Sequence, residues 1–138
     1  MSEKKEPREN YVVIVGCGRL GAHLAERING RGSSVVVIDT NPDAFRSLPP
    51  DFSGFTIEGD ATELSVLRQA KCSQADLFVA ATGNDNLNLM AAQIAGPILG
   101  ARRSLARVDD PETAAAFENV GIDVISPTTI MAGLFLTA

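Results

Sequence analysis

The stretch YVVIVGCGRLGAHLAERING, Tyr11–Gly30, decides the fold of this chain. Its first five residues, Tyr11–Val15, form a continuous β-branched and aromatic run, which is typical of a strand buried on both faces. The glycine-rich segment GCGRLG, Gly16–Gly21, follows at once. Apolar residues then recur every four positions, at Leu20, Leu24 and Ile28. This recurrence predicts a helix with one apolar face, which Gly30 and Gly32 end.

The same alternation of strand and helix continues to the end of the chain. The predicted strands are Tyr11–Val15, Ser34–Ile38, Gly54–Glu58, Ala75–Ala81, Arg103–Val108 and Asp123–Ser126. The helices predicted after the first one are Pro42–Leu48, Thr62–Ala70, Asp85–Leu99 and Pro111–Asn119, and we expect Pro97 to kink or end the third of these. Because right-handed crossovers join parallel strands, the pattern predicts an α/β fold. We expect a Rossmann-like, doubly wound, six-stranded parallel sheet in the order 3-2-1-4-5-6.

The length of 138 residues predicts one folded domain. We expect a disordered lead-in at residues 1–10 and a nucleotide-binding domain at residues 11–127. Residues 128–138 resemble the start of a helix with nothing to pack on, so this segment is either truncated or in contact with a partner. Its apolar part, Ile130–Leu136, suggests self-association or contact with a missing segment.

Composition excludes several classes of protein. The net charge of −5 argues against a nucleic-acid partner, because such proteins usually carry a basic face. Cys17 and Cys72 have no spacing for a disulfide framework or a metal site, and the chain starts without an export signal, so we expect a cytoplasmic protein. No apolar stretch is long enough to span a bilayer, and we expect no direct membrane insertion.

The glycine-rich segment has the spacing Gly-x-Gly-x-x-Gly between a strand and a helix. In this context Gly16 makes the tight turn, Gly18 lets a pyrophosphate approach the backbone, and Gly21 lets helix and strand pack closely. We expect Cys17 to be a small apolar residue between Gly16 and Gly18. Leu20 precedes the last glycine of the segment. The helix N-terminus offers free N–H groups and a partial positive charge to the phosphates.

Asp39 ends the second predicted strand, 23 residues after Gly16. A carboxylate there accepts hydrogen bonds from the ribose hydroxyls and repels a 2′-phosphate. The position favours NAD, ADP or ATP over NADP; the alternative is an ordinary turn residue before Pro42.

Further loops follow strands at the same edge of the sheet, where ligands bind in such folds. Asp60 and Ala61 follow the third strand, where Asp60 either accepts from an adenine amino group or caps a helix, as Thr62 also can. Thr82 and Gly83 follow the fourth strand, where they are placed to line the ribose and pyrophosphate.

Two arginines are candidate phosphate ligands. Arg19 can reach a distal phosphate with its planar, five-donor cation, or it can be an exposed residue of a first helical turn. Arg107 lies within the fifth strand, where a buried cation needs an anionic partner, and either a phosphate or Asp109 would serve.

Taken together, these segments resemble the KTN domain, the N-terminal RCK-type or TrkA-N domain of Trk/Ktr potassium-uptake regulatory proteins and of potassium-channel gating rings. The resemblance covers about Tyr11 to Ala138. It rests on the glycine-rich segment with Arg19, Asp39, Gly59–Thr62, Ala80–Asn86, Ala106–Pro111 and Gly121–Pro127.

The resemblance implies a cytoplasmic, non-catalytic domain that binds NAD(H) or ADP/ATP and gates a membrane potassium or cation transporter or channel subunit. It implies a homodimer or higher ring. By position it assigns pyrophosphate to Gly16–Leu20, the ribose to Asp39, the adenine side to Asp60, the centre of the nucleotide to Thr82–Gly83, and a phosphate to Arg107. The family usually continues into a second ligand domain, which we do not expect within these 138 residues. No calcium site is expected, because Arg107 and Asp109 occupy that neighbourhood.

The alternative is the Rossmann half of an NAD-dependent oxidoreductase whose catalytic domain is absent. Hydride transfer needs a substrate pocket and an acid–base residue near the nicotinamide. The single histidine, His23, falls roughly opposite the apolar face of the first helix, so we expect it in solvent. We therefore predict no catalytic residue and no enzyme activity.

Overall fold

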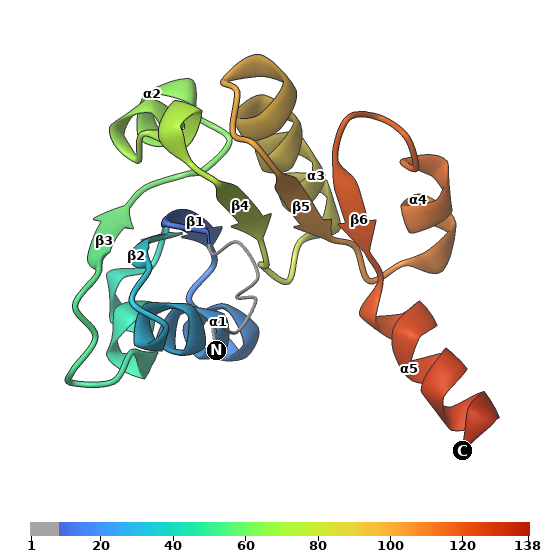
Figure 1. Cartoon of the computed structure of the whole chain (residues 1–138). Coiled ribbons are helices and arrows are strands. Elements are labelled where there is room, and N and C mark those ends of the chain that lie inside the picture. Colours follow the sequence, from blue (N-terminus) through green and yellow to red (C-terminus); the bar gives the residue numbers. More distant parts are fainter. Residues whose placement is uncertain (1–8) are drawn as a thin grey trace, which may run out of the picture.

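The computed structural model describes residues 9–138 and contains one six-stranded parallel sheet (Figure 1). Its strands are β1 (Tyr11–Val15), β2 (Ser34–Asp39), β3 (Phe55–Glu58), β4 (Leu77–Ala80), β5 (Ser104–Arg107) and β6 (Asp123–Ile125). The strand order is β3-β2-β1-β4-β5-β6, and each neighbouring pair is parallel. The predicted fold class and strand order are thus confirmed.

β1 lies at the centre because it pairs on both sides. Val12 is aligned with Val35 of β2 on one side and with Leu77 of β4 on the other. The β-branched residues of β1 from Val12 onward are buried, as the continuous apolar run predicts for a strand covered on both faces. The strand order changes direction between β1 and β4, and this switch point positions the site.

Helices cover both faces of the sheet. They are α1 (Arg19–Gly30), η1 (Pro42–Ser47), α2 (Leu64–Gln69), η2 (Cys72–Gln74), α3 (Asp85–Gln93), η3 (Ile94–Ile98), α4 (Pro111–Ala116) and α5 (Pro127–Thr137). Residues of α1 and η1 pack with Ile14 and Val37 on one face. Residues of α2, α3 and α4 pack with Val13 and Phe78 on the other.

The buried face of α1 agrees in part with the predicted one, because Leu24 and Ile28 pack against the core. Gly21, Ala22 and Ala25 are its buried residues, whereas Leu20 is 38% exposed. Small side chains face the sheet because the helix lies close to β1, and Leu20 is turned toward the carboxyl edge of the strands. His23 is exposed, as expected.

Several predicted helices are shorter than the periodicity suggests. The long helix starting at Asp85 is regular only to Gln93 and continues as the π-helical turn η3, which contains Pro97. A proline cannot donate the regular helical hydrogen bond, so the irregularity falls where we expected a kink. α2 begins at Leu64 with Glu63 at its N-cap, and the expectation that Thr62 caps this helix is wrong.

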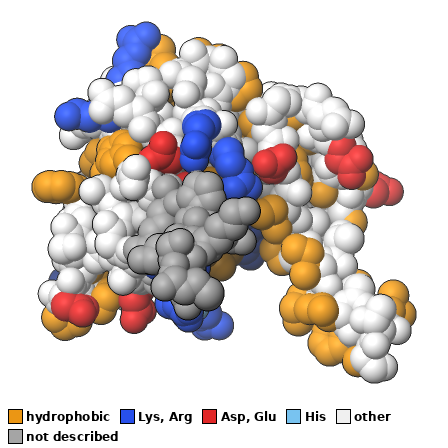
Figure 2. All heavy atoms as spheres, in the orientation of Figure 1, with side chains coloured by type: hydrophobic (Ala, Val, Ile, Leu, Met, Phe, Trp, Pro, Cys, Tyr) orange, Lys and Arg blue, Asp and Glu red, His pale blue; other side chains and the backbone are white. Residues whose placement is uncertain are grey.

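α5 leaves the end of β6 and projects from the body of the domain (Figure 1). None of its residues is buried, and Leu134, Phe135 and Leu136 are 60%, 74% and 85% exposed. Figure 2 shows hydrophobic side chains along this arm. Most of the predicted lead-in, residues 1–8, lies outside the described residues. Over residues 9–138, no helix is both long and apolar enough to cross a membrane.

Candidate functional site

A pocket of about 540 Å³ opens at the carboxyl edge of the sheet, over the switch point between β1 and β4. The carboxyl ends of five strands, β1 to β5, and the first turn of α1 contribute to its wall. The lining residues are Val15, Gly16, Gly18, Arg19, Leu20, Ile38, Asp39, Thr40, Gly59, Ala61, Ala81, Thr82, Gly83, Asn84, Leu87 and Arg107. Segments up to 92 residues apart therefore meet around one cavity, because the carboxyl ends of parallel strands share one edge.

The three glycines of the Gly16–Gly21 segment differ in the space around them. Gly16 has φ +98°, and a Cβ atom there would lie 3.0 Å from a methyl carbon of Thr82. A Cβ at Gly21 would lie 1.7 Å from the carbonyl oxygen of Gly16, so α1 could not pack so closely against the turn. A Cβ at Gly18 would meet nothing within 4 Å, which leaves its backbone open to the pocket. The turn at Gly16 and the close packing at Gly21 agree with the roles predicted from the spacing, and the approach of a pyrophosphate to Gly18 stays a prediction.

The predicted site residues Cys17 and Gly21 are not among the residues that line the pocket. Cys17 is 1% exposed and its side chain belongs to the core beneath α1, as expected of a small apolar spacer. Burial, and second the Asp39 carboxylate, raise the pKa of the Cys17 thiol. A neutral thiol is suited to this apolar position.

Asp39 joins the glycine-rich segment to the end of β2. Its Oδ2 accepts a hydrogen bond from the Cys17 backbone N–H at 2.7 Å, and its Oδ1 accepts one from Asn41 N–H at 2.8 Å. Each carboxylate oxygen has a second lone pair, so the side chain retains capacity for ribose hydroxyls in the pocket that it lines.

Arg19 and Leu20 lie at the exposed rim of the pocket, in the first turn of α1. Gly18 is the N-cap residue, so no side chain accepts from the first N–H groups of this 12-residue helix. The helix N-terminus and the Arg19 guanidinium thus present donors to the same cavity, which suits a phosphate group.

Asp60 faces its own loop. Its Oδ1 accepts from Thr62 N–H at 2.8 Å and from Thr62 Oγ1 at 2.7 Å, and these bonds lower the pKa of Asp60. Asp60 is not among the lining residues, whereas its neighbours Gly59 and Ala61 are. Contact with an adenine amino group stays a prediction for Asp60.

The loop after β4 is organised by α3. Thr82 and Gly83 line the pocket, and Asn84 caps α3 by accepting from Leu87 N–H at 3.0 Å. Asn88, completely buried in α3, bonds both to Thr82 and to the backbone of Arg107. Our sequence analysis missed Asn88. Its helical spacing from Ala92 and Ala95 would have placed it on the buried face of α3.

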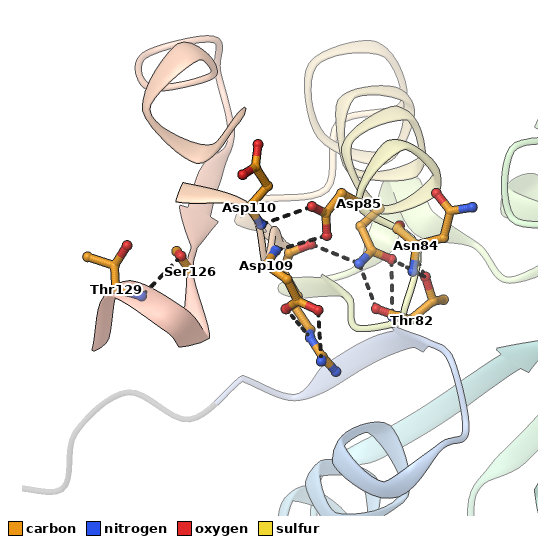
Figure 3. Close-up of polar contacts among 9 residues, drawn as sticks. Thr82, Asn84, Asp85, Asp109, Asp110, Ser126 and Thr129 are labelled. Carbon is orange, nitrogen blue, oxygen red and sulfur yellow. Dashed lines mark hydrogen bonds and ion pairs between the residues drawn. The ribbon is translucent and has the colours of Figure 1, made fainter. Parts of the chain in front are cut away.

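Arg107 is engaged by Asp109 in this structure. The Arg107 Nε–Asp109 Oδ1 distance is 2.8 Å, and a second bond joins Arg107 Nη2 to Asp109 Oδ2 at 3.1 Å. This pairing raises the pKa of Arg107. Asp85 of α3 accepts from the backbone N–H groups of Asp109 and Asp110, as Figure 3 shows. Of the two partners expected for Arg107, the structure contains Asp109, and Arg107 still lines the pocket.

The arrangement offers hydrogen-bond donors and one carboxylate around a partly apolar cavity. In the described part of the chain, no group of three or more His, Cys, Asp or Glu side chains could hold a metal ion. The chemistry that fits these residues is non-covalent binding of an anionic, hydroxylated ligand.

Comparison with known proteins connects this geometry to one family. The TrkA-N domain matches residues 12–127. The Trk system potassium uptake protein TrkA of Streptomyces coelicolor is 35% identical over 116 residues, which cover 84% of this chain and 52% of that protein. A TrkA homolog of Methanothermobacter thermautotrophicus is 38% identical over 124 residues, 89% of this chain and 57% of its own length. The chain thus spans about half the length of these relatives.

Solved structures show the same fold. The TrkA-N domain of the Escherichia coli inner membrane protein ybaL superposes with a TM-score of 0.81 at 20% identity, covering 94% of this chain and 96% of that one. The GsuK channel bound to NAD superposes with a TM-score of 0.77 at 23% identity, covering 96% of this chain and 24% of that one. A structure of GsuK bound to ADP has a TM-score of 0.75 at 23% identity, covering 93% and 33%. At these identities the likeness concerns the fold.

Proposed function

This chain belongs to the TrkA-N domain family, and from that premise we propose that it is a regulatory domain that binds an adenine nucleotide. Its ligand is NAD(H) or ADP/ATP. The bound nucleotide regulates a membrane transporter or channel for potassium or another cation, to which the domain is attached or bound on the cytoplasmic side.

The observation that carries the proposal is the pocket at the switch point. It combines the glycine-rich turn, the uncapped N-terminus of α1 and the Asp39 carboxylate in one cavity. A dinucleotide or nucleoside diphosphate needs donors for its phosphates and an acceptor for its ribose, and this cavity offers both. The relatives named for Trk potassium uptake support the transport system, and the GsuK structures with NAD and ADP support the ligand class.

Selectivity against NADP follows from charge. A 2′-phosphate on the ribose would lie close to Asp39, and two negative groups at that distance repel each other. We therefore propose that NADP and NADPH bind much more weakly than NAD or ADP.

The proposal assigns binding and regulation to the chain, and no reaction. It includes a homodimer or a higher ring, because a nucleotide can regulate a partner only by favouring one arrangement of the assembly over another. It includes no nucleic-acid partner, since the chain carries a net charge of −5.

The test is a thermal-shift titration of the purified chain with NAD, NADH, ADP, ATP and NADPH, followed by calorimetry. A ligand present at 100 times its Kd adds about 2.7 kcal/mol to the free energy of unfolding. For a chain of this length we expect Tm to rise by about 9 °C with NAD(H) or ADP/ATP and to change little with NADPH. If none of the five ligands raises Tm, the nucleotide-binding function is wrong.

A further inference from the structure

The most completely bonded side chain near the pocket is Asn88, which is 0% exposed and lies one turn into α3. Its amide nitrogen donates to the carbonyl oxygen of Thr82 at 2.9 Å and to that of Arg107 at 2.8 Å. Its amide oxygen accepts from Thr82 N–H at 3.1 Å and from Thr82 Oγ1 at 2.6 Å. An amide can donate two hydrogen bonds and accept two, so the side chain is fully satisfied.

These four bonds join two neighbouring strand ends. Ala80 of β4 and Ala106 of β5 are the last aligned pair of these two strands. Thr82 lies two residues after Ala80, and Arg107 directly follows Ala106. Beyond this pair, backbone hydrogen bonds between β4 and β5 no longer hold the two segments together. There the Asn88 amide bonds to both segments and sets the distance between them.

Both bonded residues line the pocket, and Thr82 also contacts the glycine-rich turn. A Cβ atom at Gly16 would lie 3.1 Å from the Thr82 backbone nitrogen, so the two loops are in close contact. A displacement of Thr82 would therefore move one wall of the cavity toward or away from the turn that faces it. Asn88 itself is not among the lining residues.

We infer that Asn88 is a positioning residue for nucleotide binding: it holds the loop after β4 and the carboxyl end of β5 at the spacing that the ligand needs. This inference rests on the proposed function. Asn88 acts without touching the nucleotide, because its bonds fix the backbone of Thr82 and Arg107, which line the pocket.

The test compares Asn88→Ala and Asn88→Asp with Ser104→Ala. Ser104 is a matched control because it is also buried, and its hydroxyl donates to Ala92 O at 2.7 Å, which joins the same two elements, α3 and β5, outside the pocket. We expect all three variants to lower Tm. We expect only the Asn88 variants to raise the Kd for NAD or ADP, by about tenfold or more, at a temperature where circular dichroism shows them folded.

Asn88→Asp adds a pH signature. A buried carboxylate facing two carbonyl oxygens is destabilised, so its pKa is raised and it regains a proton, and with it one donor, as the pH falls. The affinity of this variant for NAD should recover between about pH 8 and about pH 5.5, relative to the wild type, whereas that of Asn88→Ala should not. Equal Kd values for the folded Asn88 variants and the wild type would overturn the inference.

A measurement on the wild type covers the case in which the variants do not fold. In NMR titrations with NAD or ADP, the Asn88 side-chain amide signals should shift together with the backbone amides of Gly16–Gly18. If the glycine signals shift while those of Asn88 do not, the positioning role is wrong and nucleotide binding stands. If no signal shifts and no Tm rises, the proposed function itself fails.

Discussion

The Asp39 carboxylate lines the pocket and also accepts a hydrogen bond from the glycine-rich turn. Its bonds to Cys17 N–H and Asn41 N–H hold the glycine-rich turn against the end of β2. A turn that is held in one conformation loses less conformational freedom when a ligand binds. We therefore expect substitutions of Asp39 to change both ligand affinity and local order.

Two substitutions of Asp39 test its role in ligand binding. Asp39→Ala should weaken NAD and ADP alike by about 1–3 kcal/mol, because the charged hydrogen bonds to the ribose are lost. Asp39→Asn keeps the size and one acceptor, so it should weaken NAD less and reduce the discrimination against NADPH. Calorimetry with the three ligands measures both effects, and unchanged affinity in Asp39→Ala would remove Asp39 from the site.

Gly21 and Gly30 form a matched pair within α1. A Cβ at Gly21 would lie 1.7 Å from Gly16 O, whereas a Cβ at Gly30 would meet nothing within 4 Å. Gly21→Ala should reduce the free energy of unfolding by more than about 3 kcal/mol, because α1 must move off the turn. Gly30→Ala should be neutral or stabilise by up to about 1 kcal/mol, because alanine favours helix. Urea unfolding measures both, and similar values would mean that α1 does not pack closely at Gly21.

At the scale of elements, α3 holds the loops that follow β4 and β5. The backbone N–H of its N-cap residue Asn84 donates to Thr82 Oγ1, its first-turn residue Asp85 accepts from Asp109 N–H, and its buried Asn88 donates to Arg107 O. α3 can do so because it packs directly over β4 and β5, with Leu89 and Ala92 in the core. The other end of the same helix carries the irregular turn with Pro97, away from the pocket.

α5, in contrast to α3, has no side chain buried against the rest of the domain. It has 11 residues and no buried side chain, and Ser126 caps it by accepting from Thr129 N–H at 3.3 Å. Isolated helices of fewer than about 12–15 residues are marginal in water. We expect the backbone amides of α5 to exchange with solvent far faster than those of β1 in dilute protein, as measured by hydrogen exchange.

A concentration series serves as the control for α5. Fast exchange of the α5 amides at all protein concentrations agrees with a helix that packs on nothing. If sedimentation shows a monomer and the α5 amides are as protected from exchange as those of β1, the prediction is wrong.

For the whole molecule, we expect the carboxylates that hold strand starts and turns to contribute to the response to acid. Asp76 accepts hydrogen bonds from the backbone N–H groups of Tyr11 and Asn10, and these bonds lower its pKa. Bonds from Thr62 and Thr113 likewise lower the pKa of Asp60 and Asp110. A lowered folded-state pKa stabilises the fold above the unfolded value of about 3.9, and this stabilisation is lost as the pH falls further.

Asp76→Asn tests this prediction. The variant should be less stable than the wild type at pH 7, because the charged acceptor that joins β1 to β4 is lost. The difference should shrink as the pH falls below about 3.9, where the wild-type carboxylate is also neutral. Thermal unfolding at both pH values, with the exposed Asp51→Asn as control, measures it, and a difference independent of pH would show that the hydrogen bonds to Asp76 do not depend on its charge.

The sequence alone determined the order of strands and helices, the parallel sheet and the candidate nucleotide loop. These depend on short-range signals: a continuous β-branched run at Tyr11–Val15, glycines at fixed spacing, and Asp39 at a strand end. Such signals act through local backbone preferences and burial periodicity, which a single segment contains in full. The match to the TrkA-N domain, residues 12–127, contains Asp39 and the glycine-rich segment.

Only the tertiary structure decided which side chains meet. It turned Leu20 toward the pocket, decided between the two partners that the sequence left open for Arg107, and buried Asn88 between two strand ends. Asn88 is 19 residues from its partner Arg107, and the helical pattern of α3 says nothing of that distance. The physical reason is that a buried polar group is stable only when its partners are supplied by other elements, and those partners are set by how the elements pack.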